Sequence, residues 1–396
     1  MKPKRRDLRS AYDAALEAVD PRRAVAESMS LSGSILRVGS HAFEDVSRDQ
    51  IVVVALGKAA ASMAFGAQDA VGASRGMVVM PHDAPSPFAL CVGSHPIPSE
   101  SSLRCGEALL EFVADTGPSD LLVFLVSGGG SAIAVAPIAD VSIEEIAEMN
   151  RRLIDSGMTI TEINAARASV SRIKGGGLAD AAGTRRQVSL ILSDVPGSGP
   201  EHVASGPTIG GTSAPGDALF EVVGSSEIAA HAAADHLIAQ GFTVSIATTN
   251  LRGESAVVAR QLIDATPPGT ITIAAGETTV EVSGSGVGGR NQEAALAAAI
   301  HTDRQDVLFA ALGTDGIDGP TEAAGAIVDG DTAQRARESG VDLVTALRNN
   351  DSHTALTALG ETLVTGPSGT NVADLWFVAK GPQPGWSARN DRMALL

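Results

Sequence analysis

Residues 51–61 read IVVVALGKAAA, a fully apolar run followed by a glycine turn and the start of an alanine-rich stretch. Six consecutive apolar residues are typical of a parallel strand buried on both faces, and the alanines predict a helix directly after it. Apolar runs followed by small or polar residues recur at 121–126 and 188–192. Strands that alternate with helices in this way predict a doubly wound, Rossmann-like α/β domain. Its functional loops should follow the carboxyl ends of the strands.

The length of the chain predicts two domains, because 396 residues exceed what one ordinary hydrophobic core supports. The composition turns to Gly, Pro, Ser and Thr around residues 210–216, and a second series of α/β elements follows. We therefore predict a first domain over residues 1–222 and a smaller α/β domain over residues 223–396. The first 50 residues read as helices that lead into the first strand.

Charge and composition argue against several kinds of partner. The net charge is -17 and aromatic residues make up 3% of the chain, so nucleic acid and anionic lipid are poor partners. The longest apolar runs are far shorter than the about 20 residues of a membrane span. Two cysteines, Cys91 and Cys105, do not make a disulfide framework, and we expect unpaired thiols in a reducing cytoplasm.

Three glycine loops carry the features of anion-binding sites. Gly57 and Lys58 follow the first strand, where backbone N–H groups at a helix start and a mobile cation suit phosphate oxygens. The other two loops contain three glycines each, which leave room for an anion against bare backbone. They are Ser127-Gly128-Gly129-Gly130-Ser131 and Lys174-Gly175-Gly176-Gly177. Each loop taken alone is also compatible with an ordinary tight turn or linker.

A fourth glycine loop lies in the second half of the chain. Residues 284–291 read GSGVGGRN and contain the G-x-G-x-x-G pattern of dinucleotide-binding proteins, although a single match of this kind is common. Arg290 directly after the glycines instead indicates stabilisation of a phosphoryl group during transfer.

Other residue types narrow the chemistry. Carboxylates after strands are candidate magnesium ligands and equally common turn formers. They are Asp194, Glu277, Asp315 and Asp318. The eight histidines show no zinc spacing, and we interpret His95 and His353 as ordinary loop histidines with satisfied hydrogen bonds. The absence of G-x-x-x-x-G-K-[ST] and G-x-S-x-G segments excludes a P-loop kinase and does not support a serine hydrolase.

In their order along the chain, these segments resemble the class II glycerate 2-kinases, whose second domain is named MOFRL. The resemblance covers about nine tenths of the chain. The matching segments are ALGKAA (55–60), GSHPIPSE (93–100), LVSGGGSA (125–132), EIN (162–164), RIKGGGLAD (172–180), LILSDVPG (190–197), ASGPT (204–208), GETTV (276–280), GGRNQE (288–293), GTDGIDGPTEAAGA (313–326), NDSH (350–353) and GTNVADL (369–375).

The resemblance implies a two-domain α/β enzyme, with a mixed sheet in its MOFRL-type domain and the active site in the interdomain cleft. It implies ATP as phosphoryl donor, Mg²⁺ or another divalent metal, and transfer to the C2 hydroxyl of D-glycerate to give 2-phosphoglycerate. A homodimer is the default expectation for a soluble enzyme.

On the matching positions, the resemblance assigns catalysis to Lys58 and Arg290, which would hold charge on the phosphoryl group or on the substrate. It assigns Asp194 as general base or metal ligand, with Asp315 as a second metal ligand. The remaining positions would bind substrate or nucleotide. They are Gly57, Ser127, Gly128, Gly129, Gly130, Ser131, Asn164, Lys174, Gly175, Gly176, Glu277 and Asn291.

The chain departs from the family pattern after the EIN segment. Arg167 is kept, but Ala168 and Ser169 stand where the family usually carries Lys-His. This leaves open whether the substrate is D-glycerate or a related 2-hydroxy acid. An NAD(P)H-dependent hydroxypyruvate reductase is the first alternative, although the first strand–helix unit lacks the dinucleotide glycines. A non-catalytic ligand-binding protein is the second, and it leaves the cationic loops in both domains unexplained.

Overall fold

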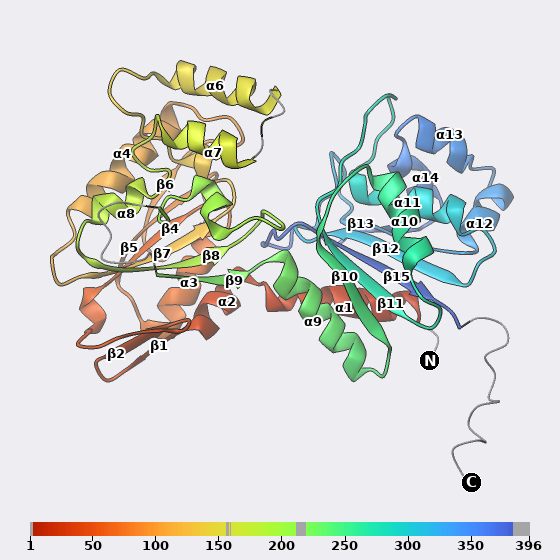
Figure 1. Cartoon of the computed structure of the whole chain (residues 1–396), viewed down its shortest axis with the longest axis horizontal. Helices are drawn as coiled ribbons and strands as arrows, with labels where there is room; N and C mark the ends of the chain where they lie inside the picture. Colours follow the sequence, from red (N-terminus) through yellow and green to blue (C-terminus); the bar gives the residue numbers. More distant parts are fainter. Residues whose placement is uncertain (1–2, 156–157, 159, 211–218, 383–396) are drawn as a thin grey trace, which may run out of the picture. The chain divides into compact units, whose positions relative to one another are not determined.

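The structure is a computed structural model that describes residues 3–155, 158, 160–210 and 219–382 (Figure 1). The chain divides into two compact units, Ala18–Ser225 and Met1–Glu17 with Ser226–Leu396. The second unit therefore includes the N-terminal segment, which we had expected in the first domain. The glycine- and proline-rich boundary predicted around residues 210–216 lies, apart from Gly210, outside the described residues.

The unit Ala18–Ser225 is built on a parallel sheet of six strands in the order β6-β5-β4-β7-β8-β9. After β4 the chain adds β5 and β6 on one side, and after β7 it adds β8 and β9 on the other. The direction in which strands are added therefore reverses between β4 and β7. The predicted doubly wound sheet is confirmed. The strands are β4 (Ile51–Leu56), β5 (Arg75–Met80), β6 (Ala89–Val92), β7 (Leu121–Ser127), β8 (Arg186–Leu192) and β9 (Phe220–Gly224).

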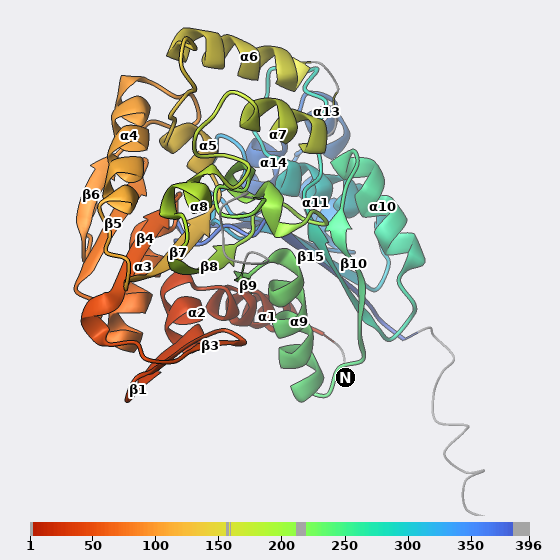
Figure 2. The same cartoon turned by 60° about the vertical axis from the view of Figure 1, so that its left-hand side comes forward.

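Helices cover both faces of this sheet (Figure 2). On one face, alternate residues of β4 and β7 pack in one core with α4 (Glu100–Ala114) and α8 (Gly177–Ala182). On the other, α3 (Ala60–Val71) packs against β4, β5 and β7 and is followed outward by α2 (Pro21–Ser28). Every residue of β4 and β7 is buried, as expected for strands covered on both sides. The remaining helical segments are η1 (Arg48–Gln50), α5 (Gly130–Ile133), α6 (Ile143–Asp155), α7 (Ile160–Ala168) and η2 (Pro200–Ser205).

The helical interpretation of the first 50 residues is wrong after residue 28. A three-stranded antiparallel sheet follows, formed by β1 (Met29–Ser32), β2 (Ile35–Val38) and β3 (His41–Phe43). Alternation along β2 buries its second and fourth residues. Gly33 and Gly39 take positive φ in the turns between the strands. Three- and four-residue strands are too short to leave a clear periodic signal in the sequence.

The expectation of two unpaired thiols is also wrong. Cys91 in β6 and Cys105 in α4 form a disulfide, with their Cα atoms 5.6 Å apart. The pairing arises because α4 packs back against the edge of the sheet to which β6 belongs.

The second unit carries a mixed sheet in the order β10-β11-β15-β12-β13-β14. The pair β10–β11 is parallel, and β15 runs antiparallel to both of its neighbours. The predicted mixed sheet is confirmed. Its strands are β10 (Val244–Leu251), β11 (Ile271–Gly276), β12 (Val307–Gly313), β13 (Gly325–Asp329), β14 (Thr362–Leu363) and β15 (Asp374–Lys380). Its helices are α1 (Arg5–Ala18), α9 (Ser226–Ala239), α10 (Ser255–Ala265), α11 (Arg290–His301), α12 (Thr332–Glu338), α13 (Leu343–Arg348) and α14 (Ser352–Ala358).

Helix α1 packs within this second unit through one apolar face that includes Leu8 and Tyr12. The Tyr12 hydroxyl donates to the carbonyl oxygen of Gly313 at 2.6 Å, which joins the helix to the end of β12. Arg5 forms an ion pair with Asp329 at 2.7 Å. These contacts explain why the first 17 residues group with the C-terminal part of the chain. Among the helices in the described residues, none combines the length and apolar character that crossing a membrane requires.

Candidate functional site

The reversal of strand order in the parallel sheet brings two of the predicted glycine loops together. β4 and β7 are neighbours, and loops at the carboxyl ends of such a pair diverge and leave a crevice for a ligand. The backbone N–H of Lys58 donates to the carbonyl oxygen of Gly128 at 2.9 Å. The N–H of Ala59 donates to the Ser127 hydroxyl at 3.1 Å. The loops after β4 and β7 therefore form one hydrogen-bonded platform.

Two glycines make this platform possible. Gly57 has φ +126°, and a Cβ there would lie 2.3 Å from the Ser127 hydroxyl oxygen. Gly129 has φ +85°, and a Cβ there would lie 3.1 Å from Cγ of Lys58 and 3.2 Å from Cδ2 of His95. A side chain at either position would push these groups apart, so the glycines allow Lys58 and His95 to lie directly over bare backbone.

Lys58 is exposed, and within the described residues its ammonium makes no ion pair and no hydrogen bond. A cation on a helix start is mildly unfavourable without an anion, since the positive end of the peptide dipoles also points there. Its position at the sheet reversal therefore indicates a site for a negatively charged ligand.

Asp194 adds a carboxylate to the same edge of the sheet. It follows β8, and its Oδ2 atom lies 1.8 Å from the place where a Cβ of Gly128 would stand. The carboxylate thus packs against the backbone of the triple-glycine loop. This arrangement places a candidate base beside the loop that holds Lys58.

His95 is a residue that the sequence analysis did not assign to the site. Its ring lies beside Lys58 and Gly129, and within the described residues it has no hydrogen-bonding partner. Burial and the charge of Lys58 both lower its pKa below the ordinary 6.5. A neutral imidazole next to the anion platform can accept a proton. Its GSHPIPSE context was visible in the sequence, but the approach of that loop to Lys58 was not.

A polar cluster continues from the glycine loop into the same unit. The hydroxyl oxygens of Ser131 and Ser205 are 2.7 Å apart, and Ser205 donates to the amide oxygen of Asn164 at 2.9 Å. The N–H of Gly175 donates to the carbonyl oxygen of Ser205 at 2.9 Å, which ties the third predicted loop to the cluster. The structure thus brings together Ser131, Asn164 and the 174–177 loop, as expected for one site. The contribution of Ser205 from η2 was missed.

Lys174 is the most buried charge in this cluster, with 5% of its surface exposed. Burial, and then the charge of Arg167, lower its pKa from 10.5 to about 8. Burial also lowers the pKa of Arg167, whose Nε donates to Asn150 at 2.8 Å. In the part of the chain that the structure describes, no carboxylate pairs with Lys174. Two neighbouring cations without an acid between them favour an anionic ligand.

In the second unit, Arg290 at the start of α11 is held by two carboxylates. Its Nε and Nη2 donate to the two oxygens of Asp374 at 2.6 and 3.1 Å, and its Nη1 donates to Glu277 at 2.5 Å. Burial alone would lower the pKa of Arg290, but the hydrogen bonds and charge of Asp374, and the charge of Glu277, raise it. Three of the five guanidinium N–H groups are occupied, which leaves two for a ligand.

The G-x-G-x-x-G loop before Arg290 is hydrogen-bonded to a later segment of the same chain. The N–H groups of Ser283 and Gly284 donate to the side chain of Asn350, and that of Ser285 donates to Asn349. A Cβ at Gly284 would lie 2.2 Å from the carbonyl oxygen of Asn349. These glycines are therefore needed for packing against the segment before α14, and the N–H groups of Gly284 and Gly286 are not free for a pyrophosphate.

Backbone N–H groups at the start of α11 also have an acceptor within the chain. The buried carboxylate of Asp318 accepts hydrogen bonds from the backbone N–H groups of Asn291 and Gln292 at 3.0 and 2.8 Å. The side-chain amide of Asn291 donates to Asp318 and accepts from Trp376 Nε1 at 2.7 Å. Asn291, predicted to bind a ligand, is thus buried with both ends of its amide in use, which supports a structural role.

The two predicted metal ligands lie in different units. Asp194 follows β8 in the first, whereas Asp315 in the second caps its own turn by accepting from the N–H of Ile317 at 3.0 Å. Within the described ranges, no group of three or more His, Cys, Asp or Glu residues could hold a metal ion. Carboxylate oxygens nevertheless are the donors that Mg²⁺ prefers.

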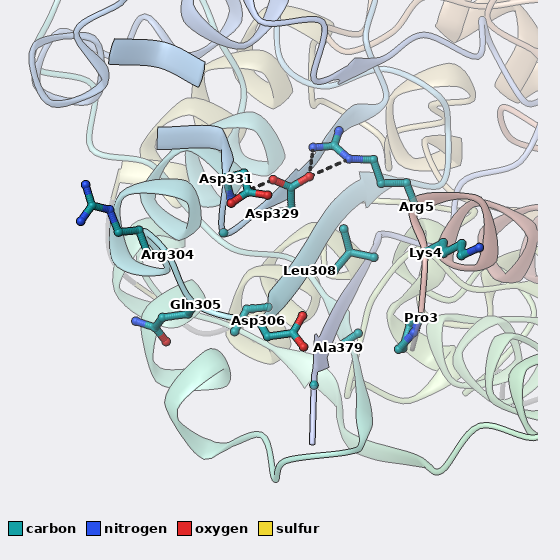
Figure 3. Close-up of a pocket in the computed structure, with 13 residues that line it drawn as sticks. Pro3, Lys4, Arg5, Arg304, Gln305, Asp306, Leu308, Asp329, Asp331 and Ala379 are labelled. Atoms are coloured by element: carbon teal, nitrogen blue, oxygen red, sulfur yellow. Dashed lines mark hydrogen bonds and ion pairs between the residues drawn. The ribbon is translucent and has the colours of Figure 1, made fainter. Parts of the chain in front are cut away.

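A separate hollow of about 590 Å³ lies in the second unit, where α1 begins beside β12 and β13 (Figure 3). Charges of both signs line it, among them the Arg5–Asp329 pair. It contains none of the predicted site residues, so we place the candidate active site at the platform formed by Lys58 and the triple-glycine loop.

Comparison with known proteins identifies the family of the chain. Residues 7–238 match a family described as a domain of unknown function (DUF4147), and residues 270–374 match the MOFRL family. A D-glycerate 2-kinase of Thermotoga maritima is 35% identical over 91% of this chain and 94% of its own. A putative hydroxypyruvate reductase of Agrobacterium vitis is 33% identical over 95% of this chain and 94% of its own. The crystal structure of a glycerate kinase from Thermotoga maritima matches with a TM-score of 0.82 at 32% identity, covering 94% of this chain and 98% of that one.

Proposed function

The chain belongs to the glycerate 2-kinase family that carries the DUF4147 and MOFRL domains, and from this premise we propose that it phosphorylates the C2 hydroxyl of D-glycerate with ATP. The products would be 2-phosphoglycerate and ADP. One observation of this chain's own residues carries the proposal. Lys58, whose ammonium has no carboxylate partner among the described residues, lies over the triple-glycine loop at the reversal of a parallel sheet. This is the arrangement that a transferring phosphoryl group requires, because positioning and charge stabilisation supply most of the catalysis.

In the proposed reaction, the C2 hydroxyl oxygen attacks the γ-phosphorus of ATP while the bond between that phosphorus and the β–γ bridging oxygen breaks. Lys58 stabilises the negative charge on the phosphoryl oxygens, and bare N–H groups of the glycine loop orient them. Asp194 accepts the proton from the C2 hydroxyl. Arg290 is assigned to the same reaction by the family resemblance, with Asp374 fixing the orientation of its guanidinium.

We propose Mg²⁺ as the divalent ion that accompanies ATP, because kinases use it to neutralise phosphate charge. Asp194 is the carboxylate best placed to contact it, since it packs on the triple-glycine loop. ATP as donor also favours the cytoplasm as the place of reaction. The homodimer stays a prediction based on the general frequency of such assemblies.

The reductase alternative requires a loop that can receive the pyrophosphate of a dinucleotide. In such enzymes the pyrophosphate binds glycine-loop N–H groups at a helix start. Here the G-x-G-x-x-G loop donates its N–H groups to Asn349 and Asn350, and Asp318 occupies the start of the helix. The first strand–helix unit, which would normally bind the dinucleotide, has Gly57-Lys58 instead. These observations favour the kinase.

The decisive experiment incubates the purified chain with MgATP and D-glycerate and identifies the product by ³¹P NMR. A parallel sample contains NADH and hydroxypyruvate. We expect 2-phosphoglycerate in the first sample, lost in Lys58→Ala and kept in Lys380→Ala, a control lysine at the end of β15. Oxidation of NADH without phosphoryl transfer would overturn the kinase assignment.

A further inference from the structure

Lys174 is buried, and no acid in the described part of the chain compensates its charge. Only 5% of the Lys174 surface is exposed, and its ammonium has no hydrogen-bonding partner among the described residues. Burying a charge without a partner is costly, so such groups are rare unless a ligand completes them. The chain has 46 acidic residues, yet none of those described forms an ion pair with this cation.

Groups from three segments converge around this lysine. Arg167 and Asn164 come from α7, and Arg167 is close enough for its charge to lower the pKa of Lys174. Ser205 comes from η2 and Ser131 from α5, and their hydroxyls contact each other. The cluster therefore combines two cations with neutral hydrogen-bonding groups, which is the complement of a small anion such as a carboxylate.

The turn that carries Ser205 has an unusual backbone. Ala204 and Ser205 have φ of +51° and +61°, in the left-handed region that non-glycine residues rarely adopt. Conformations of this kind are unfavourable for residues other than glycine and persist only where the surroundings enforce them. Here the turn directs the Ser205 hydroxyl between Ser131 and Asn164.

The cluster is continuous with the platform formed by Lys58 and the triple-glycine loop in the same unit. Ser131 directly follows Gly129 and Gly130, and a Cβ at Gly130 would lie 2.8 Å from Cβ of Ala204. The turn before Ser205 thus packs on the loop that carries the platform. In a 2-hydroxy acid the carboxylate is attached to the carbon that bears the reacting hydroxyl. Adjacent subsites for a phosphoryl group and a carboxylate suit that geometry.

We propose that Lys174 and Arg167, with Asn164 and Ser205, form the carboxylate subsite through which this chain selects 2-hydroxy acids as phosphoryl acceptors. The inference rests on the proposed kinase function and names the acceptor-binding part of its site. Ala168 and Ser169 bring no charge to this subsite, so Lys174 and Arg167 supply its positive charge. A nucleotide triphosphate is a poorer fit, because it carries more negative charge than two cations match and Lys174 is too enclosed for its bulk.

The test compares wild type with Lys174→Met, a side chain of similar length without charge. Steady-state kinetics are measured with D-glycerate and with glycerol, the neutral analogue that lacks the carboxylate. Loss of a charge-assisted hydrogen bond predicts a rise in the KM for D-glycerate of about tenfold to a hundredfold. The KM for ATP should change less than twofold, and the preference for D-glycerate over glycerol should fall by the same factor. Arg104→Met removes an exposed cation of α4 and should change none of these values.

Thermal unfolding distinguishes lost recognition from lost structure. Lys174→Met removes an uncompensated buried charge, so its Tm should be higher than that of wild type, whereas a misfolded variant would have a lower one. A rise in the KM for ATP with an unchanged KM for D-glycerate would overturn the subsite. If wild type transfers no phosphoryl group to D-glycerate, the proposed function fails first. Calorimetric titration with D-glycerate then decides the subsite: equal binding to wild type and Lys174→Met overturns it, and loss of binding in the variant supports it.

Discussion

Replacing Gly128 with alanine tests whether the position of Asp194 matters for phosphoryl transfer. A Cβ at residue 128 would stand 1.8 Å from Oδ2 of Asp194 and 2.3 Å from its Cγ, whereas real Cβ contacts essentially never fall below 3.0 Å. The carboxylate must therefore move away by at least 1.2 Å, the difference between 3.0 and 1.8 Å. Gly128 does not have the positive φ that an alanine would resist, so the substitution acts through this contact.

The expected effect on catalysis is large compared with the effect on folding. A displacement of about 1 Å in a reacting geometry costs about 10²-fold in rate. Overpacking costs about 1–3 kcal/mol of stability, and the Asp194 side chain can relieve it by rotating. We therefore expect Gly128→Ala to lower kcat about a hundredfold while it unfolds within a few degrees of the wild-type Tm.

The assay measures kcat for D-glycerate phosphorylation by a coupled ADP readout, alongside thermal unfolding of the same preparations. Gly117→Ala is the matched control, because a Cβ there would lie 3.4 Å from Oδ2 of Asp120, an ordinary van der Waals contact, and Gly117 also has no positive φ. A Gly128→Ala protein that folds like wild type and keeps kcat within twofold would refute the reasoning. Asp194 would then lie outside the reacting geometry.

Three further predictions concern single groups. Lys174 has a folded-state pKa of about 8, below its ordinary 10.5, so the folded chain binds fewer protons than the unfolded chain between these two pH values. The free energy of unfolding should therefore rise from about pH 8 to pH 10.5. In Lys174→Met this rise should vanish, and urea titration at pH 7 should show a free energy of unfolding that is higher by roughly 3 kcal/mol at most. Asp318→Ala removes the carboxylate that accepts from the N–H groups of Asn291 and Gln292, so the chain should lose about 2–4 kcal/mol in the same assay, and an unchanged midpoint would contradict the capping role. Reducing the Cys91–Cys105 disulfide should cost about 3 kcal/mol, seen as a Tm that falls with dithiothreitol in wild type but not in Cys105→Ala.

Much of the candidate site was predictable, because it depends on a rule of sheet geometry. The loops at Gly57 and Ser127 both follow apolar runs that read as parallel strands, and the carboxyl ends of such strands share one edge. Local pattern was enough to place Lys58 on that edge. What the pattern could not supply was the order of the strands, and with it the fact that β4 and β7 are neighbours.

The glycine loop before Arg290 shows where local pattern fails. Its G-x-G-x-x-G spacing is the same whether glycines make room for a cofactor or for the chain's own backbone. Its N–H groups donate to Asn349 and Asn350, which lie 64 and 67 residues after their donors in the sequence. Asp374, which holds Arg290, lies 84 residues beyond it. Pairings at such separations are set by the mixed sheet and are not visible in any window of the sequence.

His95 was misjudged for a related reason. A histidine in a proline-containing loop is most often hydrogen-bonded to its surroundings, and this general frequency favoured a structural interpretation. The structure instead leaves the ring without a hydrogen-bonding partner among the described residues and sets it beside Lys58 and Gly129. Asp194 is the proposed base, so Asp194→Asn should abolish the acidic limb of the pH profile of kcat, whereas His95→Gln should keep it. Whichever variant abolishes that limb identifies the group that must lose its proton.

The distribution of charge gives the strongest physical argument that the platform and the subsite belong to one function. The chain has 46 acidic and 29 basic side chains, so a cation can readily find an acid partner. Arg290 does so twice, whereas Lys58 and Lys174 have no acid partner among the described residues. Leaving two lysines of one unit uncompensated, one of them buried, costs stability that folding alone would not select. The cost is explained if an anion binds at each lysine. The phosphoryl group of ATP is the anion proposed for Lys58, and the carboxylate beside the reacting hydroxyl of the acceptor is the anion proposed for Lys174.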